Sequence, residues 1–173
     1  MNEVLSCLKE RRSVRAYRDE QVPREILEQI LEAGTYAPTG MGRQSPIMIA
    51  VQDKETRDLL SRLNASVMGS GSDPFYGAPT VVVVLTRRDA FTGVEDASLV
   101  MGNLLNAAFS LGVDSCWIHR AKEVFDSPEG KELLKKWNVE GDYIGIGNCI
   151  LGYRATELPQ PKARKDDYIR YIG

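Results

Sequence analysis

The sequence predicts a single α+β domain in which helices flank a central sheet. Its 173 residues suit one domain of ordinary size, and contents of 43% hydrophobic and 27% charged residues are typical of a globular protein. Val81 to Leu85 is a continuous β-branched and apolar run, which predicts a strand buried on both faces. Apolar residues at helical spacing after Pro23 predict an amphipathic helix that ends at Gly34 and Pro38.

The remaining elements follow from apolar patterning and capping residues. Asp53 is a candidate N-cap, Gly112 a candidate C′ residue, and Ser127-Pro128 an N-cap followed by proline at the first helical position. Further helices are therefore expected at about Val4 to Lys9, Asp53 to Val67, Glu95 to Leu111 and from Ser127 onward. Further strands are expected at Ile47 to Val51, Val113 to Ile118 and Ile144 to Tyr153.

The segment after Ala155 is polar and contains prolines, but it ends in apolar residues. These are Tyr168, Ile169, Tyr171 and Ile172. A tail this short cannot bury them by itself, so we expect it to dock, and another subunit is the candidate surface. The small residues of the helix at 95–111 would also allow a second helix to approach closely.

Composition and missing motifs exclude several classes of protein. A formal charge of −2 argues against nucleic acid as the main partner, and no apolar run reaches the length of a signal peptide or membrane span. Three cysteines without a CxxC spacing predict reduced thiols and a cytoplasmic location, and a single histidine leaves a zinc site short of ligands. Gly145 to Ile150 lacks the third glycine of a dinucleotide-binding fingerprint, and no P-loop or hydrolase elbow is present.

Two basic segments indicate an anionic ligand. Arg11-Arg12-Ser13-Val14-Arg15 lies near the start of the chain, and Lys162-Ala163-Arg164-Lys165 lies near its end. Guanidinium groups stay charged and present forked donors that suit phosphate, so a phosphorylated small molecule is the expected partner. The alternatives are that Arg11 and Arg12 form a solvated helix end paired with Glu10 and Asp19, and that the second segment is a disordered basic tail.

An ordered series of segments resembles the FMN-dependent nitroreductase family over essentially the whole chain. The series runs from Arg11–Arg15 through Ala37-Pro38-Thr39-Gly40-Met41-Gly42-Arg43-Gln44, Ser115-Cys116-Trp117-Ile118 and Ile150-Leu151-Gly152-Tyr153 to Lys162-Ala163-Arg164. The resemblance implies a nitroreductase-like fold with a central, mostly antiparallel sheet. It also implies an intertwined homodimer with FMN at the subunit interface, each tail of about 155–173 docking on the partner.

The resemblance also assigns residues to parts of FMN. Arg11 and Ser13 would contact the phosphate or ribityl end with Arg12 beside them, and Lys162 and Arg164 would complete the phosphate site. Arg15 would lie near N1 and O2 of the flavin, where a fixed cation stabilises the reduced anion. The other assigned residues are Pro38, Thr39, Gly40 and Gln44 from the partner's loop, Asn64 at the pyrimidine edge, and Trp117, Ile118 and His119 along the flavin near N5.

Several of these residues could instead have purely structural roles. Thr39 to Gly42 could be an ordinary turn that ends a helix, Trp117 a core residue, His119 a surface residue, and Asn64 a plain helix residue. Proton delivery is expected from solvent, with His119 as the only side-chain candidate.

The implied activity is an FMN-dependent NAD(P)H oxidoreductase. Hydride would pass from NADH or NADPH through flavin N5 to a small flat acceptor, such as a nitroaromatic compound or a quinone, by ping-pong chemistry. The alternative is a non-catalytic module for FMN storage or sensing. Gly42 and Ser45-Pro46 depart from the family's asparagine and Pro-Trp, and the chain is shorter than the larger members, so the acceptor is the least constrained part.

Overall fold

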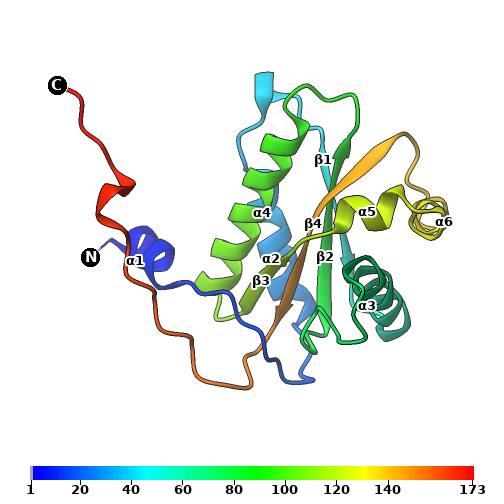
Figure 1. Ribbon diagram of the computed structural model, residues 1–173, viewed down its shortest axis with the longest axis horizontal. Coiled ribbons are helices and arrows are strands. Elements are labelled where there is room, and N and C mark those ends of the chain that lie inside the picture. Colours follow the sequence, from blue (N-terminus) through cyan, green and yellow to red (C-terminus); the bar gives the residue numbers. More distant parts are fainter. Residues whose placement is uncertain (1) are drawn as a thin grey trace.

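A computed structural model describes residues 2–173 and contains four strands, six α-helices and two short 3-10 turns among them (Figure 1). In chain order the elements are α1 (Glu3–Glu10), α2 (Arg24–Thr35), η1 (Gly40–Gly42), β1 (Pro46–Val51), α3 (Lys54–Met68), β2 (Thr80–Arg87), α4 (Gly93–Ser110), β3 (Asp114–Ile118), α5 (Ala121–Asp126), α6 (Pro128–Lys136), β4 (Tyr143–Gly152) and η2 (Asp166–Tyr168). No helix within the described residues is long and apolar enough to cross a membrane.

The four strands form one sheet in the order β1-β2-β4-β3, and each neighbouring pair is antiparallel. The expectation of a mostly antiparallel sheet between helices is therefore confirmed. The register between β2 and β4 shifts once, where Val84 pairs with Gly147 but Leu85 pairs with Gly145. Such a bulge increases the local twist of the sheet.

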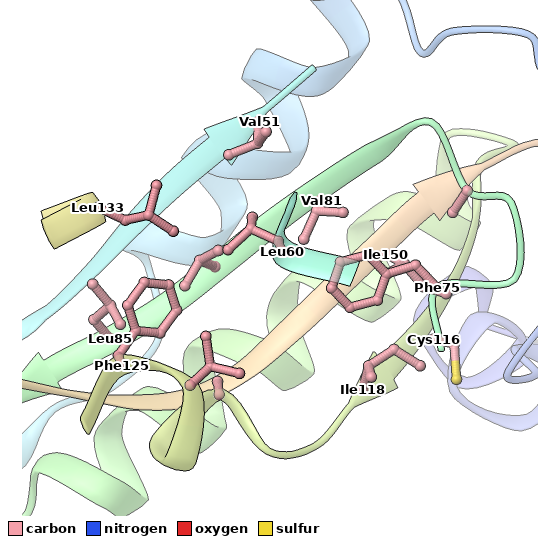
Figure 2. Close-up of a cluster of buried hydrophobic side chains, with 14 of the residues drawn as sticks. Val51, Leu60, Phe75, Val81, Leu85, Cys116, Ile118, Phe125, Leu133 and Ile150 are labelled. Carbon is pink, nitrogen blue, oxygen red and sulfur yellow. The ribbon is translucent and has the colours of Figure 1, made fainter. Parts of the chain in front are cut away.

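Side chains on the two faces of the sheet build two hydrophobic clusters. Val81, Val83 and Leu85 of β2 face α3, α5 and α6, whereas Val82 and Val84 face α2 and α4. Figure 2 shows the first cluster, with Phe125 from α5, Leu60 from α3 and Leu133 from α6 over the sheet. Residues 80–86 are all buried, which confirms that β2 is covered on both faces.

The predicted helix ends are largely confirmed. The Asp53 side chain accepts a hydrogen bond from the Thr56 backbone at 2.8 Å, and Ser127 accepts one from Gly130 at 3.1 Å. Gly112 follows α4 with φ of 75°, the left-handed conformation that favours glycine. The sequence did not predict α5, because this helix is only six residues long and has no side-chain cap at its start. Buried packing of Val124 and Phe125 holds it in place.

Two glycines that superficially resemble a nucleotide-binding motif serve packing instead. A Cβ on Gly145 would overlap the backbone of Ala121 at the start of α5. A Cβ on Gly147 would overlap the indole of Trp117, which lies across this glycine. Both positions therefore let a neighbouring element approach β4 closely.

The segment after α1 is fixed along the outer edge of β3. Ser13 pairs with Ser115 as an isolated parallel bridge, and the Val14 amide donates to the Ser115 carbonyl at 3.1 Å. Further along, the Arg18 amide donates to the Tyr153 carbonyl and the Ala155 amide to the Ala16 carbonyl, both at 2.9 Å. The start of the chain and the start of the tail are thus joined through backbone hydrogen bonds, and Figure 1 shows both termini on the side away from α3 and α6.

Candidate functional site

Arg11 stands at the end of α1, and one nitrogen of its guanidinium is buried. Its Nη1 atom is inaccessible to solvent and has no hydrogen-bond partner, and within residues 2–173 the side chain forms no ion pair with Glu10 or Asp19. The solvated-pair alternative therefore does not describe Arg11. Burial raises the pKa of the Cys149 thiol on β4, and the nearby Arg11 charge partly opposes this rise.

Arg12 has a different environment from Arg11. Its Nη1 donates to the carbonyls of Lys9 and Arg11, both at 2.7 Å, so it caps the last turn of α1. Within residues 2–173 its buried Nε atom has no hydrogen-bond partner, and neither has the buried hydroxyl of Ser115 on the strand that pairs with Ser13. Arg15 is exposed and makes no hydrogen bond or ion pair with the described residues.

This group of donors fits an anion. Of the four buried side-chain polar atoms without a partner in residues 2–173, three belong to Arg11, Arg12 and Ser115, on paired segments. A buried cation without an acceptor is costly, and a phosphate supplies several acceptor oxygens together with opposite charge. The residues present therefore fit the phosphate end of FMN.

The second basic segment is not brought to the first within one protomer. Lys162 and Arg164 are exposed, and no hydrogen bond or ion pair within the described chain joins them to Arg11–Arg15. The tail leaves the sheet at Arg154, which is held at 3.0 Å by the buried carboxylate of Asp114. Their role in a phosphate site remains a prediction.

The glycine loop at Pro38–Gln44 lies against the start of α4. The Gly40 amide donates to Oδ1 of Asp96 at 2.9 Å, and the Gln44 amide donates to Thr39 Oγ1 at 3.1 Å. The loop is therefore more than a turn that ends a helix, because a residue far along the chain holds it. The sequence analysis missed Asp96, since an acidic residue in the first turn of a helix is common.

The end of β3 carries the segment expected beside the flavin. Trp117 is half-buried against Gly147, Ile118 is buried in the core and His119 is exposed. Trp117 thus packs as a core residue on one side, while His119 is open to water. Ile118 contributes to the cluster under α5 and α6.

Asn64 is fully buried, and both ends of its amide are engaged. Its Nδ2 donates to the His119 carbonyl at 2.8 Å, and its Oδ1 accepts from Arg120 Nε at 3.0 Å. Arg120 has φ of 73°, a left-handed conformation that is uncommon outside glycine. Asn64 is therefore not a plain helix residue, since it fixes the turn after β3. Arg120 is a further residue that the sequence analysis missed.

Comparison with known proteins agrees with the geometry. A model of the Nitroreductase family matches residues 8–74 and 65–153. The structure is similar to that of a Bacteroides fragilis nitroreductase with bound FMN, at 33% identity and a TM-score of 0.92 with all of both chains covered. A Desulfitobacterium hafniense nitroreductase with bound FMN gives 28% identity and a TM-score of 0.90, again over all of both chains.

A curated relative points to the same family. The Bacillus subtilis protein named FMN reductase (NAD(P)H) is 30% identical over 178 residues, which cover 90% of this chain and 67% of the relative. The family model alone spans far more than half of the chain. Together with the antiparallel sheet and the arginine segment, these matches show that the chain belongs to the nitroreductase family.

Proposed function

We propose that this protein is an FMN-dependent NAD(P)H oxidoreductase that reduces a small, flat acceptor such as a nitroaromatic compound or a quinone. The observation that carries the proposal is the buried Nη1 atom of the Arg11 guanidinium, which has no hydrogen-bond partner in residues 2–173. Structural relatives described with bound FMN and a relative named FMN reductase support it. FMN, when bound, supplies hydride transfer between the nicotinamide and the acceptor at its N5 atom.

The chain's own residues bind and orient the cofactor. In this proposal Arg11, Arg12 and Ser13 hold the phosphate and ribityl end, and Lys162 and Arg164 add two exposed cations to the phosphate. Each of these basic side chains lacks a carboxylate partner within the described residues, so none must break an ion pair to bind phosphate. Cationic side chains without a carboxylate partner suit a strongly anionic ligand.

Other residues act at the flavin ring. Arg15 lies near N1 and O2 and offsets the negative charge that develops there on reduction, because its guanidinium stays protonated. Trp117, Ile118 and His119 run along the ring, and Asn64 holds their turn. Protons come from solvent, which reaches the exposed His119 side chain. Pro38, Thr39, Gly40 and Gln44 cover the ring from the other subunit.

A homodimer is part of this proposal. Apolar side chains are exposed on α1, on α4 and at the end of the tail, and a second copy of the chain would cover them. They are Val4, Leu5, Leu8, Leu99, Tyr168, Ile169, Tyr171 and Ile172. Light scattering at micromolar concentration is expected to give twice the mass of the 19.3 kDa chain. A particle of single-chain mass would contradict the dimer.

The visible spectrum of the purified protein tests the activity. We expect a flavin spectrum that bleaches when NADH or NADPH is added without oxygen, and the faster donor identifies the preferred nicotinamide. A flavin spectrum that both donors leave unchanged would favour a module for FMN storage or sensing. A colourless protein that takes up no added FMN would overturn the proposal.

Ping-pong chemistry predicts that both substrates use one place in turn. Initial rates at several NADH concentrations should therefore give parallel double-reciprocal lines against the acceptor. A quinone and a nitroaromatic compound should also compete when mixed. Additive turnover of the two acceptors would contradict a single shared site.

A further inference from the structure

We infer that Asp96, in the first turn of α4, is a positioning residue that holds the loop Thr39–Gln44 in the shape with which it covers the flavin. The inference rests on the proposed function, because that function gives the loop its task. Asp96 itself would touch neither cofactor nor substrate. It acts through Gly40, whose amide it binds.

Both oxygens of the Asp96 carboxylate accept hydrogen bonds near the start of α4. Asp96 is buried, with only 4% of its surface exposed. Oδ1 accepts from the Gly40 amide at 2.9 Å, and Oδ2 accepts from Thr92 Oγ1 at 3.0 Å. The positive end of the α4 dipole favours a negative charge here. A buried carboxylate with two donors therefore ties the loop to a rigid helix rather than to another loop.

Steric fit reinforces the hydrogen bond. A Cβ on Gly40 would overlap Thr92 Oγ1, although the Gly40 backbone itself is outside the left-handed region. Glycine is thus required at this position by the contact with Thr92 and not by backbone conformation. The Gly40 backbone therefore lies too close to the Thr92 side chain to leave room for a Cβ.

The loop's own conformation needs this support. Met41, Gly42 and Gln44 have φ of 56°, 66° and 50°, and the left-handed region is unfavourable for the two that are not glycine. Contacts with the surrounding structure must therefore stabilise this unfavourable loop conformation. Beyond Asp96, the closing bond from Gln44 to Thr39 contributes, and Ser45 Oγ lies 3.3 Å from Thr86 Oγ1 on β2.

Loss of the anchor has a specific consequence. Without Asp96 the strained loop relaxes and no longer holds one position over the ring. Misplacement of a reacting partner by about 1 Å can reduce a rate by up to about a hundredfold. The cations assigned to the phosphate lie on other segments, so FMN content should stay close to that of the wild type.

The first experiment compares D96A, D96N and the control D73A. Asp73 is also a partly buried carboxylate, but it lies in the loop between α3 and β2, where it accepts from Arg57 and Ser61, and it is not among the residues of the proposed site. In FMN-free protein, D96A should speed hydrogen exchange at the Gly40 amide about tenfold or more. In the FMN-loaded enzyme it should lower kcat/KM for the acceptor by about ten- to a hundredfold.

The control variants separate positioning from general stability. D96N should behave almost as wild type, because its amide oxygen accepts from Gly40 and its NH2 group donates to Thr92. D73A should lower stability yet leave Gly40 exchange and acceptor kcat/KM unchanged well below its melting temperature. If D96A leaves Gly40 exchange unchanged, or lowers acceptor kcat/KM no more than D73A, the role of Asp96 is overturned.

A second pair of variants tests the close contact between Gly40 and Thr92. G40A should reproduce the D96A phenotype, and T92A in the G40A background should restore much of the activity, since it removes the overlapping hydroxyl. Failure of this rescue would overturn the steric argument. A wild-type protein that takes up no FMN would overturn the proposed function. A working flavoenzyme whose D96A variant behaves as wild type would leave the proposed function standing and would overturn only the role of Asp96.

Discussion

Replacing Arg11 by methionine is expected to weaken FMN binding by about a hundredfold and to stabilise the FMN-free protein. Hydrogen bonds to a charged group contribute about 1.5–3 kcal/mol, and about 2.8 kcal/mol corresponds to a hundredfold in affinity. In the FMN-free protein the buried Nη1 atom of Arg11 has no partner, so an apolar side chain of similar length removes an unfavourable burial. FMN titration followed by flavin fluorescence and thermal unfolding of the FMN-free protein measure the two effects.

Arg18 provides the matched control for Arg11. It lies on the same segment but pairs with Glu20 at 3.2 Å and stacks 5.5 Å above the Tyr153 ring. R18M should therefore keep the wild-type affinity for FMN. An R11M protein that binds FMN normally and unfolds at a lower temperature would show that Arg11 is a structural residue.

Replacing Asp73 by alanine is expected to lower the free energy of unfolding by about 3 kcal/mol. Its carboxylate accepts from Arg57 Nη2 and Ser61 Oγ, both at 2.6 Å, and from the amides of Phe75 and Gly77. Arg57 is only 8% exposed, so the substitution leaves a nearly buried cation without its main carboxylate. Urea unfolding of both proteins at pH 7 measures the difference.

The same carboxylate makes stability depend on pH. Burial alone would raise the pKa of Asp73, but hydrogen bonds from Arg57, Ser61, Gly77 and Phe75 outweigh it, so this pKa lies below 3.8. The folded protein therefore binds the proton less readily than the unfolded chain. The contribution of Asp73 is fully present above about pH 4 and is lost as the pH falls through and below the lowered pKa.

Unfolding measured down to pH 3 tests this contribution. Wild type should lose more stability between pH 7 and pH 3 than D73A does. D89A is the control at pH 7, because Asp89 is exposed and, among residues 2–173, its ion pair is with the exposed Arg87, so the stability of D89A should match that of wild type. A D73A protein as stable as wild type at pH 7 would refute the role given to this network.

Local signals were enough to predict most of the fold. The Asp53 cap, the Ser127-Pro128 start and the Gly112 end depend on residues within a few positions, which the sequence displays directly. The β2 strand was predictable because its β-branched run is unbroken. By contrast, α5 is short and has no side-chain cap, and contacts with residues distant in the sequence, such as the bond of Asn64 to Arg120, help to hold it, so no local pattern predicts it.

Some residues of the candidate site could likewise be predicted from local sequence, whereas others depend on contacts between distant parts of the chain. Arg11 and Arg12 were identifiable because a cluster of guanidiniums is a visible compositional signal. The contacts of Asp96 with Gly40 and of Arg120 with Asn64 each span 56 residues, and no spacing rule connects such pairs. The places of Lys162 and Arg164 in a phosphate site stay predictions, since the contacts of Lys165 with Asp167 and Tyr168 are local to the tail and none within residues 2–173 joins Lys162 or Arg164 to the arginine segment.

The backbone bonds around Ser13 also set an order of events during synthesis. The ribosome makes the arginine segment well before its pairing partners, Ser115 and Tyr153 to Ala155, which lie far along the chain. Contacts this distant in sequence close late, after the local helices and hairpins have formed. The arginine segment is therefore held in place only after β3 and the residues that follow β4 have been made, and a chain truncated before Tyr153 would lack part of this backbone frame.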